Sequence, residues 1–305
     1  MAAVLNSNMA SLWASKNLQG AQSKMADSVE RLSSGLRINR AKDDAAGLGI
    51  ANSLTQQING ANQGVRNLND GISMVQTAEG AIAAAQEMAQ RILTLATQGA
   101  NGTLGATERT AIQSEMRQLI TAINGIGTRT AFSGNTLLNV AIADAAGTAK
   151  FTLQVSNTTT DTISLDQTAF KNIGMGTGAG IAGTNNANGQ ASALINKINA
   201  SNVISADGGL AATAMQDVQT EAAGYITALS TQRSLLGAYQ NQIEYTVSNT
   251  TELASNLSAA RSSVQDTDYA SETASLTKGQ ILQQAATAML AQANQMPNVI
   301  LSLLK

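Results

Sequence analysis

The sequence contains no histidine and no cysteine. This absence removes imidazole general bases, Ser-His-Asp and Cys-His nucleophile pairs, and metal sites built from histidine or cysteine. Most of the common arrangements for catalysis are therefore excluded, and we expect neither enzymatic activity nor a cofactor. The lack of thiols is compatible with a location outside the cell but does not require one.

Charged and aromatic side chains are also scarce. Charged residues make up 12% of the 305 residues and aromatic residues 3%, whereas an average globular protein has roughly 25% charged residues. The formal net charge of -2 provides no broad attraction to nucleic acid or anionic lipid. We therefore expect no nucleic-acid partner. Small, weakly charged side chains take the place of the charged and aromatic residues, and they allow helices to approach closely.

Charge is scarcest at the two ends of the chain. Residues 279–304 carry no charged side chain, and Lys16 is the only one in residues 1–23. Chain ends are normally polar and mobile, so apolar ends need a partner, either each other or neighbouring copies. Glutamine and asparagine residues interrupt the C-terminal segment, which disfavours a membrane span. The N-terminus lacks the pattern of a cleaved secretory signal. These features favour assembly over catalysis.

Apolar residues at alternating spacings of four and three predict long helices with coiled-coil packing. The first begins after the acidic pair Asp43 and Asp44, which is typical of a helix N-terminus, and continues to about Gln98. A shorter helix from about Thr107 is expected to fold back against it. After residues 207–209, the helical period resumes and holds to about Val264.

Gly60, Gly64, Gly71 and Gly80 lie inside the first long helix. Each costs about 1 kcal/mol of helix stability relative to alanine. The pattern is consistent with local weakness or with the close approach of another helix. Near the C-terminus, Pro297 is expected to stop or kink the last helix, because proline lacks the backbone N–H.

The middle of the chain changes period. Phe151, Leu153 and Val155 alternate with polar residues, and Ile163 and Leu165 do so again. This period of two over short runs predicts a β-hairpin. Residues 174–189 are rich in glycine, threonine and asparagine and predict a loop, with a short helix at residues 191–200.

Together these patterns predict a mainly α fold. We expect a long antiparallel helical hairpin, a coiled-coil rod, with paired terminal helices and a small central β-hairpin lobe. Residues 1–43 plus 257–305 form the predicted terminal-helix domain, and residues 44–256 the rod domain, with a variable lobe at about 139–207. The apolar ladders of the terminal helices predict a polymerisation interface. Its members are Leu5, Met9, Leu12, Leu18, Leu282, Met289, Ala293 and Met296.

Two sets of motifs at opposite ends of the chain resemble the signatures of bacterial flagellins. The N-terminal set is Arg31-Leu-Ser-Ser-Gly-Leu-Arg37, Ala41-Lys-Asp-Asp-Ala-Ala-Gly47, Asn69-Asp-Gly-Ile72 and Gln76-Thr-Ala-Glu-Gly80. The C-terminal set is Ala259-Ala-Arg261, Asp266-Thr-Asp-Tyr-Ala270, Gln280-Ile-Leu-Gln-Gln284 and Leu290-Ala-Gln-Ala-Asn-Gln-Met-Pro297. The resemblance covers about the first 140 and the last 100 residues, and two long motif sets in the correct order make it specific.

The resemblance implies a structural subunit that is exported unfolded through the flagellar type III channel. It then polymerises with identical copies beneath a cap into the helical filament used for swimming, outside the cell. The terminal-helix domain would form the inner tube. The flagellar cap, the hook-filament junction proteins and an export chaperone are the implied partners. A Toll-like innate receptor is a further implied partner, whose main contacts match Arg91, Leu95 and Glu115, whereas Leu93 and Thr94 replace polar or charged residues.

Three other functions can be compared with the filament subunit. A flagellin-like hook-filament junction protein shares the terminal helices but occurs in few copies, so open-ended polymerisation separates the two. A surface binding module carried by the central lobe is a second alternative, although no aromatic platform or charged cluster there indicates a ligand. A flagellin variant with an inserted metalloprotease is excluded by the absence of histidine.

Overall fold

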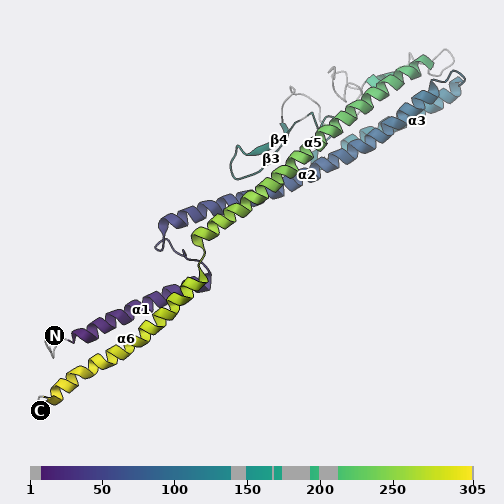
Figure 1. Ribbon diagram of the computed structural model, residues 1–305. Helices are drawn as coiled ribbons and strands as arrows, with labels where there is room; N and C mark the ends of the chain where they lie inside the picture. The colour runs from purple at the N-terminus through teal and green to yellow at the C-terminus, as the bar shows by residue number, and fades with distance from the viewer. Residues whose placement is uncertain (1–7, 139–148, 167, 174–192, 199–211, 304–305) are drawn as a thin grey trace. The chain divides into compact units, whose positions relative to one another are not determined.

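The computed structural model describes residues 8–138, 149–166, 168–173, 193–198 and 212–303, with the side chains of the last helix described up to Gln295 (Figure 1). The helices are α1 Met9–Ser34, α2 Ala45–Gly99, α3 Ala106–Arg129, α5 Ala212–Gln265 and α6 Tyr269–Leu303. The strands are β1 Ala131–Phe132, β2 Asn135–Thr136, β3 Ala149–Gln154 and β4 Thr162–Asp166. The predicted mainly α fold is confirmed.

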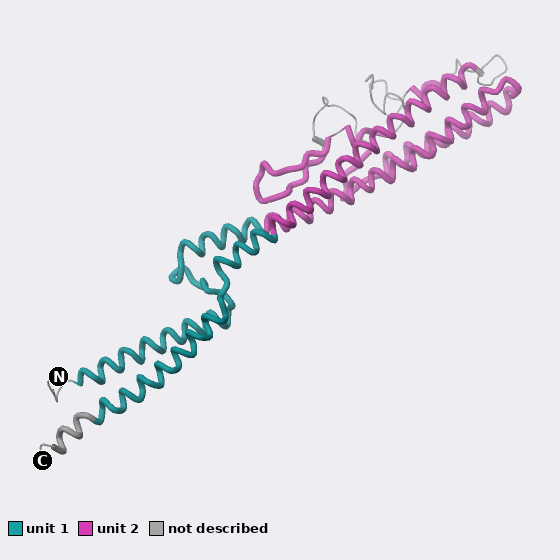
Figure 2. Tube along the Cα trace, viewed as in Figure 1, with its two compact units in different colours: residues 1–58, 255–305 teal, residues 59–254 magenta. Residues whose placement is uncertain are grey.

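The chain divides into two compact units (Figure 2). Unit 1 consists of residues 1–58 and 255–305, and unit 2 consists of residues 59–254. The functional division into an inner-tube domain of residues 1–43 plus 257–305 and a rod domain of residues 44–256 stays a prediction.

Unit 2 packs α3 and the unit's parts of α2 and α5 around one core. Gln86 donates a hydrogen bond to Ser230, and Gln219 donates one to Thr97. Because residue numbers rise along α2 as they fall along α5, the two helices run antiparallel, as the sequence predicted. The α2 side of the core is rich in alanine. The fully buried residues that α2 contributes are Leu68, Val75, Ala78, Ile82, Ala85, Ala89, Ile92 and Ala96.

The predicted β-hairpin is confirmed. β3 and β4 pair antiparallel, with Phe151 opposite Leu165 and Leu153 opposite Ile163. The Phe151 ring also meets the Phe170 ring edge to face, with centroids 5.2 Å apart. Aromatic pairs prefer this geometry because the ring edge is positive and the face negative.

Gly60, Gly64 and Gly71 of α2 contact this hairpin and its turn. Of the two interpretations of the glycines, close approach therefore holds for these three, but the approaching element is a hairpin and not another helix. A methyl group added at Gly64 would overlap the Val155 carbonyl, and one at Gly60 would lie 2.8 Å from the Cβ of Asn157. Gly71 faces the Leu153 side chain in the same way, whereas Gly80 has nothing within 4 Å of an added Cβ. The hairpin therefore packs directly against the α2 backbone.

Side chains of α5 make hydrogen bonds to the backbone of residues 149–166 and 168–173. The Tyr239 hydroxyl accepts a hydrogen bond from the Asp166 backbone N–H at 3.1 Å. Gln232 donates to the Ala169 carbonyl at 3.1 Å. The buried Tyr225 hydroxyl donates to the Ile173 carbonyl at 2.8 Å, and burial raises the pKa of Tyr225 above its ordinary value. These bonds satisfy backbone groups that the short sheet leaves unpaired.

Three predictions for the middle of the chain have mixed outcomes. Residues 193–198 are helical, which agrees with the predicted helix at 191–200, whose remaining residues lie outside the described part. The predicted loop at 174–189 and most of the lobe at 139–207 also lie outside it.

The sequence analysis did not predict the short antiparallel pair of β1 and β2. Its turn contains Ser133 and Gly134, with φ values of 49° and 82°. Two positive φ angles suit a two-residue hairpin turn.

Pro297 was expected to stop or kink the last helix. The stop is wrong, because α6 continues through Pro297 to Leu303, and a kink stays a prediction. In an α-helix, the N–H of residue 297 would donate to the Ala293 carbonyl, and proline has no such hydrogen. The side-chain amide of Asn8 donates to this carbonyl instead, at 2.7 Å. The carbonyl is therefore satisfied from α1 rather than from its own helix.

Candidate assembly surface of the terminal helices

α1 and α6 lie side by side in unit 1 along a seam of small residues (Figure 1). Ala14, Ala21 and Ser28 of α1 are buried there, with Ala293 of α6. Gly279 of α6 extends the seam, since a methyl group added to it would lie 3.5 Å from the Cβ of Met25. Small residues bring the two helices close but bury little apolar area. The pair therefore has a thin core of its own.

Most of the predicted interface residues that the structure describes point away from this seam. Met9, Leu12 and Met289 are 54%, 66% and 61% exposed, and Leu282 is also exposed. Leu18 is half-buried, and Ala293 is buried in the seam. Leu5 and the side chain of Met296 lie outside the described residues.

The predicted interface omits several large exposed apolar residues of these helices, of which Trp13 and Ile281 are the most exposed. Trp13 is 61% exposed and Ile281 is 60% exposed. Trp13 is the only tryptophan of the chain, and the Lys16 ammonium lies 5.9 Å from the centre of its ring. This distance falls within the range of a cation–π contact. Trp13 lies one position after Leu12, outside the spacing used to select the ladder, so periodicity alone did not select it.

A cleft of about 980 Å³ opens between the exposed faces of α1 and α6. Trp13, Leu282, Ala286 and Met289 line it, together with residues that include Lys16 and Lys24. Exposed apolar patches of this kind are typical of protein–protein contact sites. The arrangement is suited to receiving apolar side chains of another chain.

A backbone clasp joins the end of α1 to the end of α5. Arg37 N–H donates to the Gln265 carbonyl at 2.7 Å, and Thr267 N–H donates to the Gly35 carbonyl at 2.9 Å, which pairs Leu36 with Asp266 as an antiparallel bridge. Gly35 has a φ of 73° and caps α1 by donating its N–H to the Arg31 carbonyl at 2.8 Å. The left-handed conformation favours glycine at this position.

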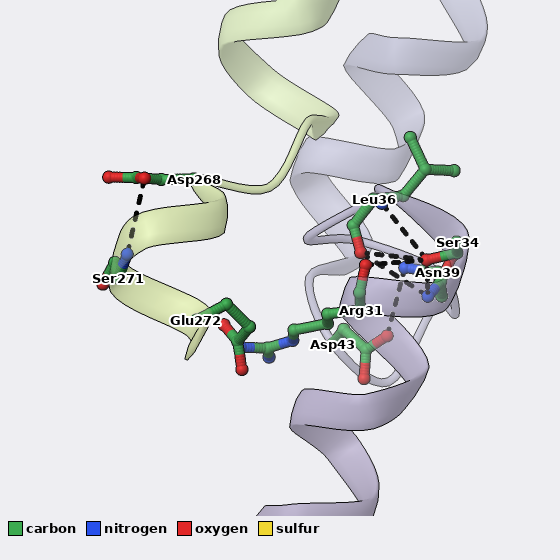
Figure 3. Close-up of polar contacts among 8 residues, drawn as sticks. All are labelled: Arg31, Ser34, Leu36, Asn39, Asp43, Asp268, Ser271 and Glu272. Atoms are coloured by element: carbon green, nitrogen blue, oxygen red, sulfur yellow. Dashed lines mark hydrogen bonds and ion pairs between the residues drawn. The ribbon is translucent and has the colours of Figure 1, made fainter. Parts of the chain in front are cut away.

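Polar side chains reinforce the loop between α1 and α2 (Figure 3). The Asn39 amide donates to the Ser34 hydroxyl at 2.7 Å. The Asp43 carboxylate accepts from the Arg40 N–H at 2.9 Å and from the Asn39 N–H at 3.2 Å. These backbone bonds, that of Arg40 first, lower the pKa of Asp43 below its ordinary value. Arg31 pairs with Glu272 of α6 at 3.6 Å. The loop is therefore held by its own side chains.

The residues matched to the innate receptor separate into two groups. The Arg91 guanidinium of α2 lies 2.7 Å from the Glu115 carboxylate of α3, and both side chains are substantially exposed. Leu95 is only 1% exposed and belongs to the core of unit 2. The expectation that Leu95 offers its side chain to a receptor is therefore not met by this structure.

Comparison with known proteins assigns the two helical ends to one family. Residues 5–143 match the bacterial flagellin N-terminal helical region, and residues 211–304 match the bacterial flagellin C-terminal helical region. Flagellin B of Vibrio cholerae is 35% identical over 376 aligned residues, covering 100% of both chains. Flagellin of Bacillus subtilis is 39% identical over 314 aligned residues, covering 99% of both.

A crystal structure of Bacillus cereus flagellin also matches, with 24% identity, a TM-score of 0.43, and coverage of 64% of this chain and 94% of that one. No helix in the described part of the chain is long and apolar enough to cross a membrane. The two matched regions belong to a family of structural proteins. The chain belongs to the bacterial flagellins, which confirms the resemblance.

Proposed function

We propose that this flagellar filament subunit polymerises through the exposed apolar faces of α1 and α6. The observation that supports the proposal is the exposure of Leu12, Trp13 and Met289 beside a seam with so little core. Large apolar side chains that gather along one cleft, as Trp13 and Met289 do, are typical of a surface that another protein covers. Copies of the same chain provide partners that cover these faces.

The strength of such contacts follows from apolar burial. Fully burying one leucine or methionine side chain contributes about 1.5–3 kcal/mol. Association itself costs on the order of 4–15 kcal/mol in lost translational and rotational freedom. Four such side chains therefore only just offset the association, so each subunit needs several neighbours. A contact between two different faces, repeated without closing, produces this arrangement in an open helical polymer.

Removal of residues 266–305 tests the role of α6. The prediction is a soluble protein that retains a folded unit 2, because the core of that unit draws on residues 59–254 alone. Circular dichroism measures the remaining helix, and negative-stain microscopy with added seeds detects filaments. Long filaments formed by the truncated protein would refute the proposal.

A single side chain provides the sharper test. Met289→Gln keeps the size of the side chain but makes it polar, whereas Met289→Leu keeps it apolar and serves as the matched control. Loss of about 1.5–3 kcal/mol predicts a critical concentration roughly 10- to 100-fold higher for Met289→Gln. Met289→Leu should polymerise like the wild type. Equal critical concentrations for all three proteins would argue against burial of Met289.

We infer the other partners of this chain from its membership of the flagellin family. Export through the type III channel to the cell exterior, growth beneath the flagellar cap, attachment to hook-filament junction proteins and binding of an export chaperone are expected of a filament subunit. Curated relatives that match the whole chain are called flagellins, which favours the filament over the junction protein. Co-purification of the cytoplasmic subunit with a small chaperone tests the chaperone interaction, and recovery of the monomer alone opposes it.

Recognition by a Toll-like receptor is a second candidate function. The exposed ion pair between Arg91 and Glu115 favours it, whereas burial of Leu95 opposes it. Reporter cells treated with purified monomer and with Arg91→Ala measure the response. A response that the substitution abolishes supports recognition at this pair, and no response from the wild type excludes it.

A further inference from the structure

The Ala293 carbonyl of α6 needs a hydrogen-bond donor from outside its helix. In a continuous α-helix each carbonyl accepts from the N–H four residues later, and for Ala293 that residue is Pro297. Proline has no backbone N–H. Nevertheless, α6 is helical through Pro297 to Leu303. A carbonyl buried in a helix seam is costly to leave without a donor.

The side-chain amide of Asn8 makes two hydrogen bonds, one with each of its ends. Its Oδ1 accepts the Ser11 backbone N–H at 3.1 Å and so caps the start of α1. Its Nδ2 donates to the Ala293 carbonyl at 2.7 Å, across 285 residues of sequence. The start of α1 and the proline-containing part of α6 therefore share a single side chain.

We infer that Asn8 is a positioning residue that replaces the N–H missing at Pro297 and so keeps the last turns of α6 helical. The inference rests on the proposed function in one respect, since those turns extend the polymerising face of α6. The donor to the Ala293 carbonyl thus comes from the N-cap residue of α1. The last turns of α6 are therefore stable only when the start of α1 is folded next to them.

The chemistry of the cap makes asparagine the required residue. Asparagine, aspartate and serine are comparable N-caps, because each has a side-chain oxygen acceptor. The amide of asparagine adds an N–H donor beside that oxygen, whereas an ionised carboxylate has none. Asn8→Asp therefore preserves the cap of α1 but replaces the donor to Ala293 with a carboxylate oxygen, which repels the carbonyl as well as losing the bond. Asn8→Ser provides an uncharged second variant with the same purpose and a shorter reach.

A neighbouring contact provides a matched control. The Ser11 hydroxyl donates to the Asn294 side-chain oxygen at 3.1 Å. This bond joins the same two helices at the same level but involves no backbone carbonyl of α6. Ser11→Ala therefore weakens the pairing of α1 with α6 without affecting the group that Pro297 leaves without a donor.

The experiment combines Asn8→Asp, Asn8→Ser and Ser11→Ala with Pro297→Ala, which restores the missing N–H. Hydrogen exchange of residues 293–303 is followed in the full chain, both as monomer and as seeded filament. Loss of one hydrogen bond predicts exchange roughly fivefold or more faster in Asn8→Asp and Asn8→Ser. Pro297→Ala should remove most of this difference, whereas the smaller effect of Ser11→Ala should be the same in both backgrounds.

Two results would overturn the inference. Unchanged exchange in both Asn8 variants would show that the last turns do not depend on the amide. An equal effect of the Asn8 variants with and without Pro297→Ala would show an ordinary contact between helices rather than replacement of a missing N–H. Failure of the wild type to form filaments would contradict the proposed function instead, and exchange in the monomer would still decide the role of Asn8.

Discussion

Replacing Gly64 with alanine sets two effects of opposite sign against each other. Alanine favours the helix by about 1 kcal/mol, because it has less backbone freedom to lose than glycine. The added methyl group, however, would overlap the Val155 carbonyl, and it would lie 2.5 Å from the carbonyl carbon. Ordinary contacts between carbon atoms are about 3.5–4.0 Å. The backbone at Val155, directly after strand β3, must therefore move away from α2 by roughly 1 Å or more.

A displacement of this size outweighs the gain in helix propensity. Forcing an extra methyl group into a packed site typically costs about 1–3 kcal/mol, and the bond of 3.0 Å from the Asn67 amide to the Gln154 carbonyl would be strained as well. Because the added methyl group would overlap the Val155 carbonyl oxygen, the cost should lie in the upper part of this range, at about 2–3 kcal/mol. Subtracting the gain of about 1 kcal/mol leaves a net destabilisation of about 1–2 kcal/mol. In a unit of this size, it should lower the melting temperature by roughly 2–8 °C.

Gly80→Ala is the matched control, because an added Cβ at Gly80 has nothing within 4 Å. This variant should be stabilised by about 1 kcal/mol through helix propensity alone. Thermal unfolding followed by circular dichroism measures both variants, and hydrogen exchange of residues 151–166 reports whether the hairpin has moved. If Gly64→Ala melted at a higher temperature than the wild type, as Gly80→Ala should, the reasoning from close contact would be wrong.

Two further predictions concern single polar groups. Tyr225→Phe removes the bond to the Ile173 carbonyl and should destabilise unit 2 by about 1–3 kcal/mol, because the buried carbonyl loses its donor; chemical denaturation measures the change, and a wild-type midpoint would contradict it. The pKa of Asp43 should be below 3.8. Its stabilising contribution is therefore present above that value and lost as the pH falls through the lowered pKa. The protection of the Arg40 amide against hydrogen exchange, taken relative to the intrinsic rate at each pH, should fall in acid in the wild type but not in Asp43→Asn, which retains an acceptor without a titrating group; identical dependence of the protection on pH in the two proteins would count against this.

The long helices were predictable because their apolar residues repeat at helical spacing over many turns. Leu68, Val75 and Ile82 hold one seam, and the structure buries all three completely. The start of α2 was predictable to within a residue or two, since the Asp44 carboxylate accepts the Gly47 N–H at 2.8 Å as a helix cap does. Asp43 differs, because its carboxylate faces back to residues 39 and 40.

The errors share a physical cause, which is contact between residues distant in sequence. Glycine spacing indicated that something approaches α2 closely, but whether a helix or a strand does so depends on where residues 153–157 fold back. Pro297 was expected to stop or kink the helix because it lacks a backbone N–H. The donor that replaces this N–H at the Ala293 carbonyl is Asn8, which is 285 positions away in the sequence and could not be found from the local pattern. Leu95 was matched through a family pattern, whereas its burial depends on how α2, α3 and α5 pack.

The candidate interface was predictable in part. Periodicity identified Met9, Leu12 and Met289 as members of apolar ladders, and their exposure shows that the ladders exceed what one helix pair covers. Periodicity also placed Ala293 in the same set, although the structure buries it between α1 and α6. Apolar periodicity predicts which residues share a helical face. It does not predict which of them are buried between α1 and α6 and which are exposed.

The backbone clasp at Leu36 and Asp266 has a mechanical consequence. It joins two points of the chain that are 230 residues apart, and all of unit 2 lies in the loop between them. Tension applied to the two chain ends is therefore carried by this short bridge before it reaches the core of unit 2. In a filament subunit the two backbone hydrogen bonds of this clasp would therefore have to break before such tension could separate α2 from α5.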